Sequence, residues 1–181
     1  MRTSLDIQQG QLQMPISRRD HTIGSPDAPV ILVEFGDYQC PYCGAAHPVV
    51  TALLDERASA LFFAFRHFPL TNVHENAQFA AESAEAAGAQ GHYWEMHNWL
   101  FEHQRQLQPS AVMAAAAAIG LDIDRFAQDL AAHAFLPKVQ EDFMTGLRSG
   151  VNGTPTFFIN GARYEGPATL EALTEAVDEF R

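Results

Sequence analysis

The chain contains two cysteines, and they stand two residues apart in the stretch FGDYQCPYCGAAHP, residues 35 to 48. The run VILVEF at 30 to 35, just before them, is short, apolar and β-branched, as is typical of a buried strand. Pro41 follows the first cysteine and suits the first turn of a helix, where its missing N–H would have no partner. The sequence therefore predicts a cysteine pair at the junction of a strand and a helix.

The pattern after this junction predicts a second strand, a block of helices and a hairpin. LFFAFRHF at 61 to 68 has the character of a buried strand, and the segment from about 75 to 149 is rich in alanine and helical in pattern. TFFI (156 to 159) and ARYE (162 to 165) flank Asn160-Gly161, a strong signal for a two-residue hairpin. A final amphipathic helix follows, with Leu170, Leu173, Val177 and Phe180 in register.

This order of elements predicts the α/β class, with a sheet domain interrupted by a helical insert. Within the helical segment, Gly120 is expected to end one helix and Asp122 to cap the next. Trp94 and Trp99 are expected in the core of the insert. His92, His97 and His103 are expected on helix surfaces, although the stripe Tyr93, Met96, His97 and Leu100 shares one helix face.

Charge and hydropathy argue against nucleic acid and membrane as partners. Eleven Lys and Arg against 22 Asp and Glu give a net charge of -11, whereas phosphate-rich partners need cationic side chains. No stretch approaches the ~20 consecutive apolar residues of a membrane helix, and the first residues lack the apolar run of a signal peptide. We expect a cytoplasmic chain as written, and a periplasmic or extracytoplasmic one if a leader was removed.

The placement of the cysteines predicts different chemistry for each. At the start of the helix, Cys40 faces unpaired N–H groups and the positive end of the helix dipole. Such a site lowers a cysteine pKa from ~8.5 to roughly 3.5–7.5 and favours the nucleophilic thiolate. Cys43, one turn further along, is expected to be buried and protonated. The pair is thus predicted to be an exposed nucleophile, Cys40, with a resolving thiol, Cys43.

Metal binding is the first alternative. A lone CxxC pair supplies two ligands, whereas a structural zinc site uses four. His47 follows Cys43 by four residues and offers a third ligand, but the sequence shows no fourth. We therefore expect no metal, and a metal-binding or redox-sensing module remains the rival interpretation. Asp37 is expected to cap the loop before the cysteines.

The motifs EFGDYQCPYC and GVNGTPTFFING, with the helical block between them, resemble the DsbA-like branch of the thioredoxin superfamily from about residue 20 to the end. The resemblance implies a thioredoxin-like fold in which a core of residues 21–73 and 151–181 carries an inserted α-helical domain at 74–150, after an N-terminal arm of residues 1–20. It implies thiol–disulfide exchange with protein substrates, no bound cofactor, and recycling by a redox partner or small thiol.

The same resemblance assigns roles to further residues. It makes Pro155 the cis-proline that faces the active site, with Thr154 before it pairing with an extended substrate strand beside Cys40. It makes Glu34 the proton acceptor for Cys43, with a pKa raised by burial. Strand alternation alone leaves open that Glu34 points outward from an edge.

Other residues near the pair receive smaller roles. Pro41 and Tyr42 set the loop between the thiols and are expected to contribute to substrate binding; the resemblance implies that they tune the redox potential through hydrogen bonding to the thiolate. His47 is a candidate modulator of Cys43. Arg66 and His67 are assigned no catalytic part.

A glutathione-using transferase or isomerase on the same fold is a further rival. Such relatives generally carry Ser or another residue at the position of Cys40, so the CPYC sequence argues against it. The direction of exchange depends on potential and partner, and the sequence leaves oxidation, reduction and isomerisation open.

Overall fold

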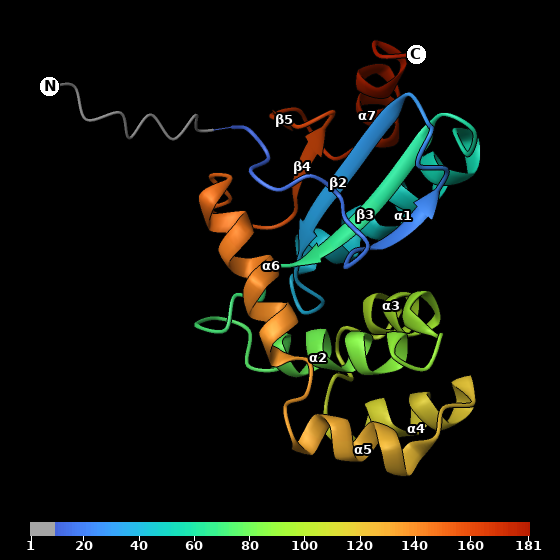
Figure 1. Ribbon diagram of the computed structural model, residues 1–181, viewed down its shortest axis with the longest axis vertical. Helices are drawn as coiled ribbons and strands as arrows, with labels where there is room; N and C mark the ends of the chain where they lie inside the picture. Colours follow the sequence, from blue (N-terminus) through green and yellow to red (C-terminus); the bar gives the residue numbers. More distant parts are fainter. Residues whose placement is uncertain (1–9) are drawn as a thin grey trace, which may run out of the picture.

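The computed structural model describes residues 10–181, which contain a five-stranded sheet with the strand order β1-β3-β2-β4-β5 (Figure 1). The strands are β1 (His21–Gly24), β2 (Val30–Gly36), β3 (Leu61–His67), β4 (Thr156–Ile159) and β5 (Ala162–Tyr164). Strands β2 and β3 are parallel, and the other neighbouring strands are antiparallel. The sheet is mixed, as expected when a βαβ unit is extended by a hairpin.

Helix α1 connects β2 to β3, five helices lie between β3 and β4, and α7 ends the fold (Figure 1). Their bounds are α1 (Pro41–Glu56), α2 (Ala77–Gly88), α3 (Tyr93–Glu102), α4 (Pro109–Ile119), α5 (Ile123–Ala131), α6 (Leu136–Arg148) and α7 (Leu170–Asp178). Helices α2 to α5 lie beyond one end of the sheet, while α6 reaches β3. The predicted α/β sheet with a helical insertion is confirmed; the exact domain limits stay a prediction.

The two central strands are buried along almost their whole length, which explains their continuous apolar sequences. Their parallel register runs from Val30 opposite Leu61 to Gly36 opposite His67. Both carboxyl ends therefore meet at the same edge of the sheet. The turn before α1 starts from this edge, and so does the segment that leads into the inserted helices.

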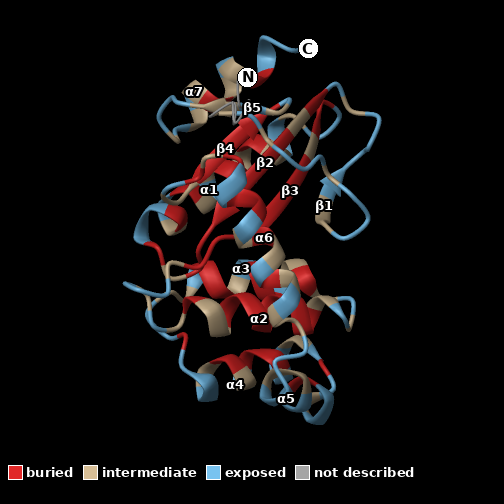
Figure 2. Ribbon diagram, turned by 60° about the vertical axis from the view of Figure 1, so that its left-hand side comes forward, coloured by how far each residue is buried: buried red, intermediate tan, exposed pale blue. Residues whose placement is uncertain are grey.

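Strands β2, β3 and β4 are buried along most of their length (Figure 2), and apolar side chains form a core on each face of the sheet. On one face, Val50 and Leu53 of α1 and Leu173 and Val177 of α7 belong to the larger core cluster. On the other face, the smaller cluster is Val33, Phe35, Ala64, Phe68, Val151 and Phe158, with Phe143 of α6 packed against it. The sheet is thus a middle layer whose buried positions are shielded from both sides.

Several local signals act as the sequence predicts. Gly120 ends α4 with a left-handed φ of 96°, and the Asp122 side chain accepts a hydrogen bond from the Arg125 N–H at the start of α5. Asn160 and Gly161 both have positive φ, 46° and 84°, as a two-residue hairpin turn of the twisted sheet requires. The hairpin and the break between α4 and α5 are confirmed.

Two details differ from the prediction. Strand β1 was not expected, because HTIG is too short and too polar to show a strand pattern; it is an edge strand held by antiparallel pairing with Phe62–Phe65 of β3. Phe180 lies beyond the end of α7 and is exposed, although Leu173 and Val177 of the same stripe are buried. Of the predicted arm, residues 1–9 lie outside the described part, and Leu12 donates its N–H to Gly161 beside β5.

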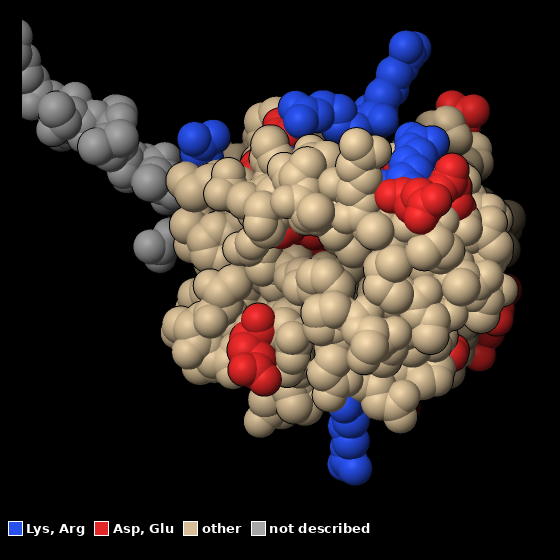
Figure 3. Space-filling model, turned by 90° about the horizontal axis from the view of Figure 1, so that it is seen from below, with Lys and Arg blue, Asp and Glu red and all other residues tan. Residues whose placement is uncertain are grey.

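None of the helices in residues 10–181 is both long enough and apolar enough to cross a membrane. The face at the α4 and α5 end shows scattered charged side chains and no continuous stretch of Lys and Arg (Figure 3). On this face, the surface therefore lacks the basic patch that a phosphate backbone requires.

A buried ion pair fastens the segment before β1 to the sheet. The Arg66 guanidinium bonds Asp20 through Nε at 2.8 Å and Nη2 at 3.0 Å, and donates to the carbonyls of Met14 and Pro15. Both charged side chains are at most 4% exposed. Burial alone would raise the pKa of Asp20, but the bonds from Arg66 outweigh it and the pKa is lowered. Arg66 thus has a structural role.

We predict that Asp20→Ala lowers the free energy of unfolding by about 3–5 kcal/mol, because the guanidinium stays buried without its counter-charge. Urea denaturation measures the loss. Glu141→Ala is the matched control: it breaks the exposed pair of Arg19 with Glu141 and should cost less than about 1 kcal/mol. Equal losses in the two variants would contradict the prediction.

Candidate active site

The two cysteines lie where β2 ends and α1 begins. Cys40 is the residue just before the helix, with extended backbone angles (φ -70°, ψ 122°), and Pro41 occupies the first turn. Asp37 and Cys40 close the intervening turn through a hydrogen bond from the Cys40 N–H to the Asp37 carbonyl. The turn places Cys40 at the N-terminus of α1 and Cys43 inside its first turn, as the sequence predicts.

Of the two cysteines, only Cys40 is more enclosed than expected. Cys43 is fully buried, as predicted, but Cys40 is only 3% exposed, so the expectation of an exposed nucleophile is wrong. The reason is a loop distant in sequence: the Thr154 carbonyl lies 3.5 Å from the Cys40 Sγ. A substrate therefore meets Cys40 together with this loop.

The surroundings of Cys40 favour its thiolate. A hydrogen bond from the Cys43 thiol has the largest effect and lowers the pKa of Cys40, whereas burial of Cys40 raises this pKa. Hydrogen bonds from the Thr154 side chain and from the N–H groups of Cys43 and Tyr42 lower it further. The resulting pKa of Cys40 is about 5. The Thr154 hydroxyl is buried with no other partner, so it is free to donate to a thiolate. Donors from the helix start and from a second loop thus converge on one sulfur.

Cys43 is held in the opposite state. Burial raises the pKa of the Cys43 thiol well above its ordinary value, and the hydrogen bond to Cys40 and the charge of Glu34 add to this effect. The Asp37 N–H, 3.5 Å from the Cys43 Sγ, partly offsets the rise. The site therefore pairs an ionised thiol with a protonated one.

Glu34 lies in the middle of the central strand, between Phe65 of β3 and Phe157 of β4. It is 3% exposed, and its Oε1 has no hydrogen-bond partner. Burial, reinforced by the negative charge of Cys40, raises the pKa of Glu34 to about 8. The alternative that Glu34 points outward from an edge is wrong, because β2 is the middle strand of the sheet.

The Thr154–Pro155 peptide bond is cis. Thr154 and Pro155 line a cavity of about 470 Å³ together with Tyr42, whose side chain is 76% exposed. Residues of the hairpin, among them Arg163 and Tyr164, form its other wall. Cys40 does not line the cavity itself, but its Sγ lies 3.5 Å from the carbonyl of Thr154, which does.

His47 is placed against the helical insertion. Its ring stacks on Phe101 of α3 with centroids 4.9 Å apart and lies 5.4 Å from the ring of His97. Burial lowers the pKa of His47, and the charge of Glu102 opposes this only in part. The contacts are those of a packing residue, and its influence on Cys43 stays a prediction.

Asp37 does more than cap the loop. Its buried carboxylate accepts hydrogen bonds from the N–H groups of Gln39 (2.7 Å) and Leu70 (2.9 Å) and lies 2.8 Å from Nδ1 of His74. One side chain therefore connects the turn before the cysteines with the segment that leads from β3 into the insertion.

The expectation that His97 lies on a helix surface is wrong. His97 is 4% exposed, and its Nδ1 lies 2.9 Å from the Tyr38 hydroxyl. Burial lowers the pKa of His97 well below its ordinary value, so the ring is neutral. The helical stripe of Tyr93, Met96, His97 and Leu100 already contained this information, because its apolar members point into the core and take His97 with them.

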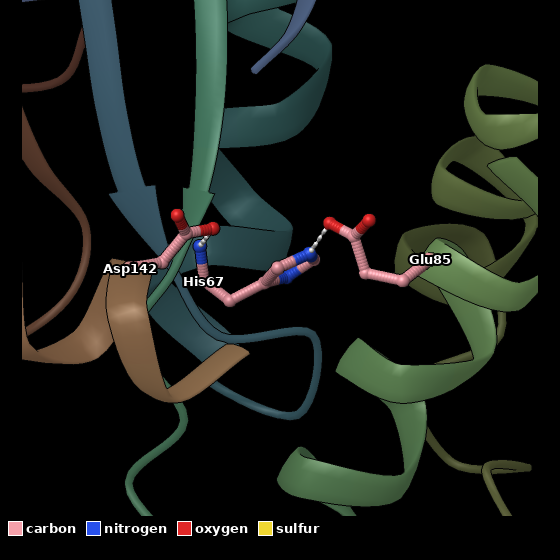
Figure 4. A group of neighbouring side chains, drawn as sticks. All are labelled: His67, Glu85 and Asp142. Carbon is pink, nitrogen blue, oxygen red and sulfur yellow. Dashed lines mark hydrogen bonds and ion pairs between the residues drawn. The ribbon is translucent and has the colours of Figure 1, made fainter. Parts of the chain in front are cut away.

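A second polar cluster joins β3 to the insertion (Figure 4). His67 of β3 lies between two carboxylates: its Nε2 is 2.8 Å from Glu85 of α2, and its backbone N–H donates to Asp142 of α6 at 3.1 Å. Glu85 also lies 2.9 Å from Nε2 of His21, and Asp142 is bonded to the Lys138 ammonium. The sequence analysis assigned His67 no catalytic part; in the structure, His67 belongs to this polar cluster between the sheet and the inserted helices.

Side chains of His67, Glu85 and Asp142 come close enough together to be considered as metal ligands. The Lys138 ammonium on Asp142 would repel a cation there, and Nε2 of His67 is already bonded to Glu85. We therefore interpret the cluster as a hydrogen-bonded network. Neither cysteine belongs to it, and residues 10–181 do not group Cys40, Cys43 and His47 at ligand distances.

The thioredoxin family model matches residues 17–179. A thioredoxin-like oxidoreductase from Silicibacter pomeroyi DSS-3 superposes with a TM-score of 0.80 at 30% identity, over 90% of this chain and 92% of that one. BdbD from Bacillus subtilis gives a TM-score of 0.83 at 22% identity (94% and 96% covered), and the thiol-disulfide exchange protein α-DsbA2 from Wolbachia pipientis gives 0.80 at 24% (91% and 89%).

Curated relatives carry a different name. The Na(+)/H(+) antiporter NhaA 1 of Salinispora arenicola is 45% identical over 179 residues, covering 97% of this chain but 27% of that protein. NhaA 3 of Salinispora tropica is 46% identical over 167 residues, covering 92% and 26%. The chain spans about a quarter of the length of these relatives, so their name describes much longer proteins.

Fold, site and comparisons agree on the class: this is a thioredoxin-like fold with a helical insertion, as the sequence motifs implied. The chain belongs to the thioredoxin family.

We predict that Cys40 titrates near pH 5 in the reduced protein, measured by the ultraviolet absorbance of the thiolate. Cys40→Ser removes this titration and is the control. Because the folded pKa lies below the unfolded value of about 8.5, the ionised thiolate stabilises the fold most above about pH 8.5, and the contribution is lost as the pH falls through about 5. A midpoint near 8.5 would show that the donors do not act on the sulfur.

We predict that Glu34→Gln raises the free energy of unfolding at alkaline pH, since the wild-type carboxylate is then ionised and buried. The pKa of Glu34 is about 8 in the folded protein and about 4.3 in the unfolded chain. The free energy of unfolding of the wild type therefore falls as the pH rises from about 4.3 to about 8, and the gain in the variant is complete above about pH 8. Urea denaturation against pH measures it. The exposed Glu75→Gln is the control, and parallel profiles for the two variants would contradict the assignment.

Proposed function

We propose that the chain is a thiol–disulfide oxidoreductase that exchanges disulfides with protein substrates through Cys40 and Cys43. The observation that carries the proposal is the pairing of a Cys40 thiol whose pKa is lowered to about 5 with a buried Cys43 whose pKa is raised. At neutral pH, Cys40 is then a thiolate and able to attack, while Cys43 is held in reserve.

The exchange proceeds in two substitutions at sulfur. The Cys40 thiolate attacks one sulfur of a substrate disulfide, a mixed disulfide forms, and the other substrate sulfur leaves as a thiolate. Cys43 then loses its proton toward Glu34 and attacks the Cys40 sulfur. The substrate is released with both sulfurs reduced, and the two electrons it gains leave a Cys40–Cys43 disulfide in the enzyme.

The reverse sequence oxidises a substrate dithiol, and the reduction potential of the pair decides the direction. When the protein reduces a substrate, a reduced partner protein or a small thiol returns its own disulfide to the dithiol. When it oxidises a substrate, an oxidised partner protein or a small-molecule disulfide returns its dithiol to the disulfide. The protein residues alone carry the chemistry. The pKa of about 8 suits Glu34 to proton transfer at neutral pH, because such a group exchanges its proton readily there.

The substrate is proposed to be an extended segment of another protein. Thr154 lines a cavity together with Tyr42 and Pro155, and it offers main-chain groups beside the Cys40 sulfur. An extended peptide that pairs with these groups brings its own disulfide to Cys40, which is a form of strand addition. Pro41 and Tyr42 shape the loop on the other side of the sulfur.

Glutathione-using enzymes on this fold remain the second candidate, but the presence of both thiols favours the dithiol mechanism. The antiporter activity in the name of the curated relatives belongs to proteins of which this chain spans about a quarter, and it carries no weight for this site.

We predict that Cys43→Ser accumulates mixed disulfides with proteins, whereas Cys40→Ser accumulates none. Without Cys43, the intermediate on Cys40 waits for an outside thiol; without Cys40, the buried and protonated Cys43 cannot begin the reaction. Non-reducing gels of each variant recovered from cells show the adducts, which should vanish when reductant is added.

The matched control is the double variant Cys40→Ser/Cys43→Ser, which should resemble Cys40→Ser. Equal adducts from both single variants, or none from Cys43→Ser, would refute the proposed roles. A metal site predicts a different result, in which loss of either cysteine lowers metal content and stability and neither variant forms adducts.

A further inference from the structure

A glutamine of the helical insertion reaches the turn that carries Cys40. Gln104 follows α3, and its Nε2 lies 2.8 Å from the carbonyl oxygen of Tyr38 and 2.8 Å from that of Cys40. Both partners are acceptors, so the side-chain nitrogen is the atom that must face them. Gln104 is separated from these residues by more than sixty positions of sequence, and neither its pattern nor its neighbours single it out.

The opposite side of the same amide is fitted to Gly44. A Cβ at Gly44 would collide with Oε1 of Gln104 and would lie 2.6 Å from its Cδ. Gly44 is in the first turns of α1, and its own N–H donates to the Cys40 carbonyl at 3.0 Å. The Cys40 carbonyl therefore receives two donors, and the absence of a side chain at Gly44 makes room for the second.

We propose that Gln104 is a positioning residue of the redox site, which holds the Cys40 turn from the insertion and thereby sets the reactivity of the Cys40 sulfur. It acts in two ways. Its two hydrogen bonds fix the carbonyls of Tyr38 and Cys40 on one side of the turn, which keeps the N–H groups of the helix start directed at the sulfur. Its amide protons also offset the negative end of the Cys40 carbonyl dipole, which otherwise opposes a thiolate in the same residue.

The contact lies at the edge of an open cavity of about 750 Å³ between α1 and the end of α3. Gln39, Pro41, His74 and Gln104 are among the residues that line it, and none of these four lines the cavity beside Thr154. Gln104 therefore connects the insertion with the turn that carries Cys40 (the redox turn, residues 37–40) at a surface that solvent reaches. A substitution that shortens the Gln104 side chain should leave the apolar core closed.

The first test is the pKa of Cys40 in the reduced Gln104→Ala protein, read from thiolate absorbance. We expect a rise of about 0.5 to 1 unit, the size of one ordinary hydrogen-bond contribution. Gln104→Glu keeps the shape of the side chain, but its carboxylate cannot donate to the two carbonyls and adds a negative charge. The rise in the Cys40 pKa should therefore be larger in this variant than in Gln104→Ala. Gln106→Ala, in the same segment and exposed, is the matched control and should leave the pKa unchanged.

The second test uses Gly44→Ala. The new methyl group should displace the flexible end of Gln104 and reproduce the rise in the Cys40 pKa, even though alanine favours a helix over glycine. In the double variant Gly44→Ala/Gln104→Ala, the rise should be no greater than in either single variant, because both act through the same contact. Additive rises would overturn the proposal, as would an unchanged pKa in Gln104→Ala.

The redox equilibrium provides a third readout. A less favoured thiolate makes the reduced form less stable, so the equilibrium constant for reduction by glutathione should fall about three- to tenfold in Gln104→Ala, with tenfold equal to about 30 mV. A merely structural role would lower the thermal midpoint and leave the pKa and the potential unchanged. The proposal deepens the proposed exchange function, yet its failure is distinct: Cys43→Ser would still trap substrates if Gln104 had no effect.

Discussion

The parallel pairing of β2 with β3 is the constraint on which the rest of the structure depends. Because both strands are buried on both faces, their apolar runs fix the register and hold the two carboxyl ends at one edge of the sheet. The Cys-Pro-Tyr-Cys turn starts from one of these ends, and the insertion is reached from the other. The antiparallel strand β4 then joins β2 on its free side and brings Thr154 and Pro155 to the same edge. The redox site is thus assembled from three chain segments by the order of strands.

The electrostatics of the site follow from how little water reaches it. Cys40, Cys43 and Glu34 are all at most 3% exposed, so a negative charge on one of them raises the cost of a charge on the others. Several hydrogen-bond donors converge on Cys40, and its pKa falls to about 5. The pKa of Glu34 rises to about 8, and that of Cys43 rises as well, although the Asp37 N–H partly offsets it. One environment therefore separates an attacking thiolate from a protonated thiol and its proton acceptor, which is the division of roles that disulfide exchange needs.

The insertion is attached to the core by polar contacts as well as apolar ones. His67 with Glu85, Tyr38 with His97, and Gln104 with two carbonyls of the redox turn all cross the seam between the sheet and the inserted helices. Buried polar contacts are costly unless every partner is in place, so they specify one arrangement of the two parts more strictly than apolar packing does. The helices are in this way part of the environment of the sulfur.

The sequence by itself determined the strands β2, β3, β4 and β5, the helix that begins at Pro41, the hairpin turn at Asn160-Gly161 and the two reactive thiols, because each has a local pattern of apolar spacing, proline, glycine or cysteine. It also pointed to Glu34, as a charge inside an apolar run. It did not determine the strand order, the enclosure of Cys40 or the burial of His97, and it was silent on Gln104. These depend on which distant segments meet: Thr154 covers Cys40 across 114 positions, and Gln104 reaches its carbonyl across 64. Hydrogen-bond donors and solvent exclusion act through space, so the properties of the sulfurs were decided only when tertiary packing brought those segments together.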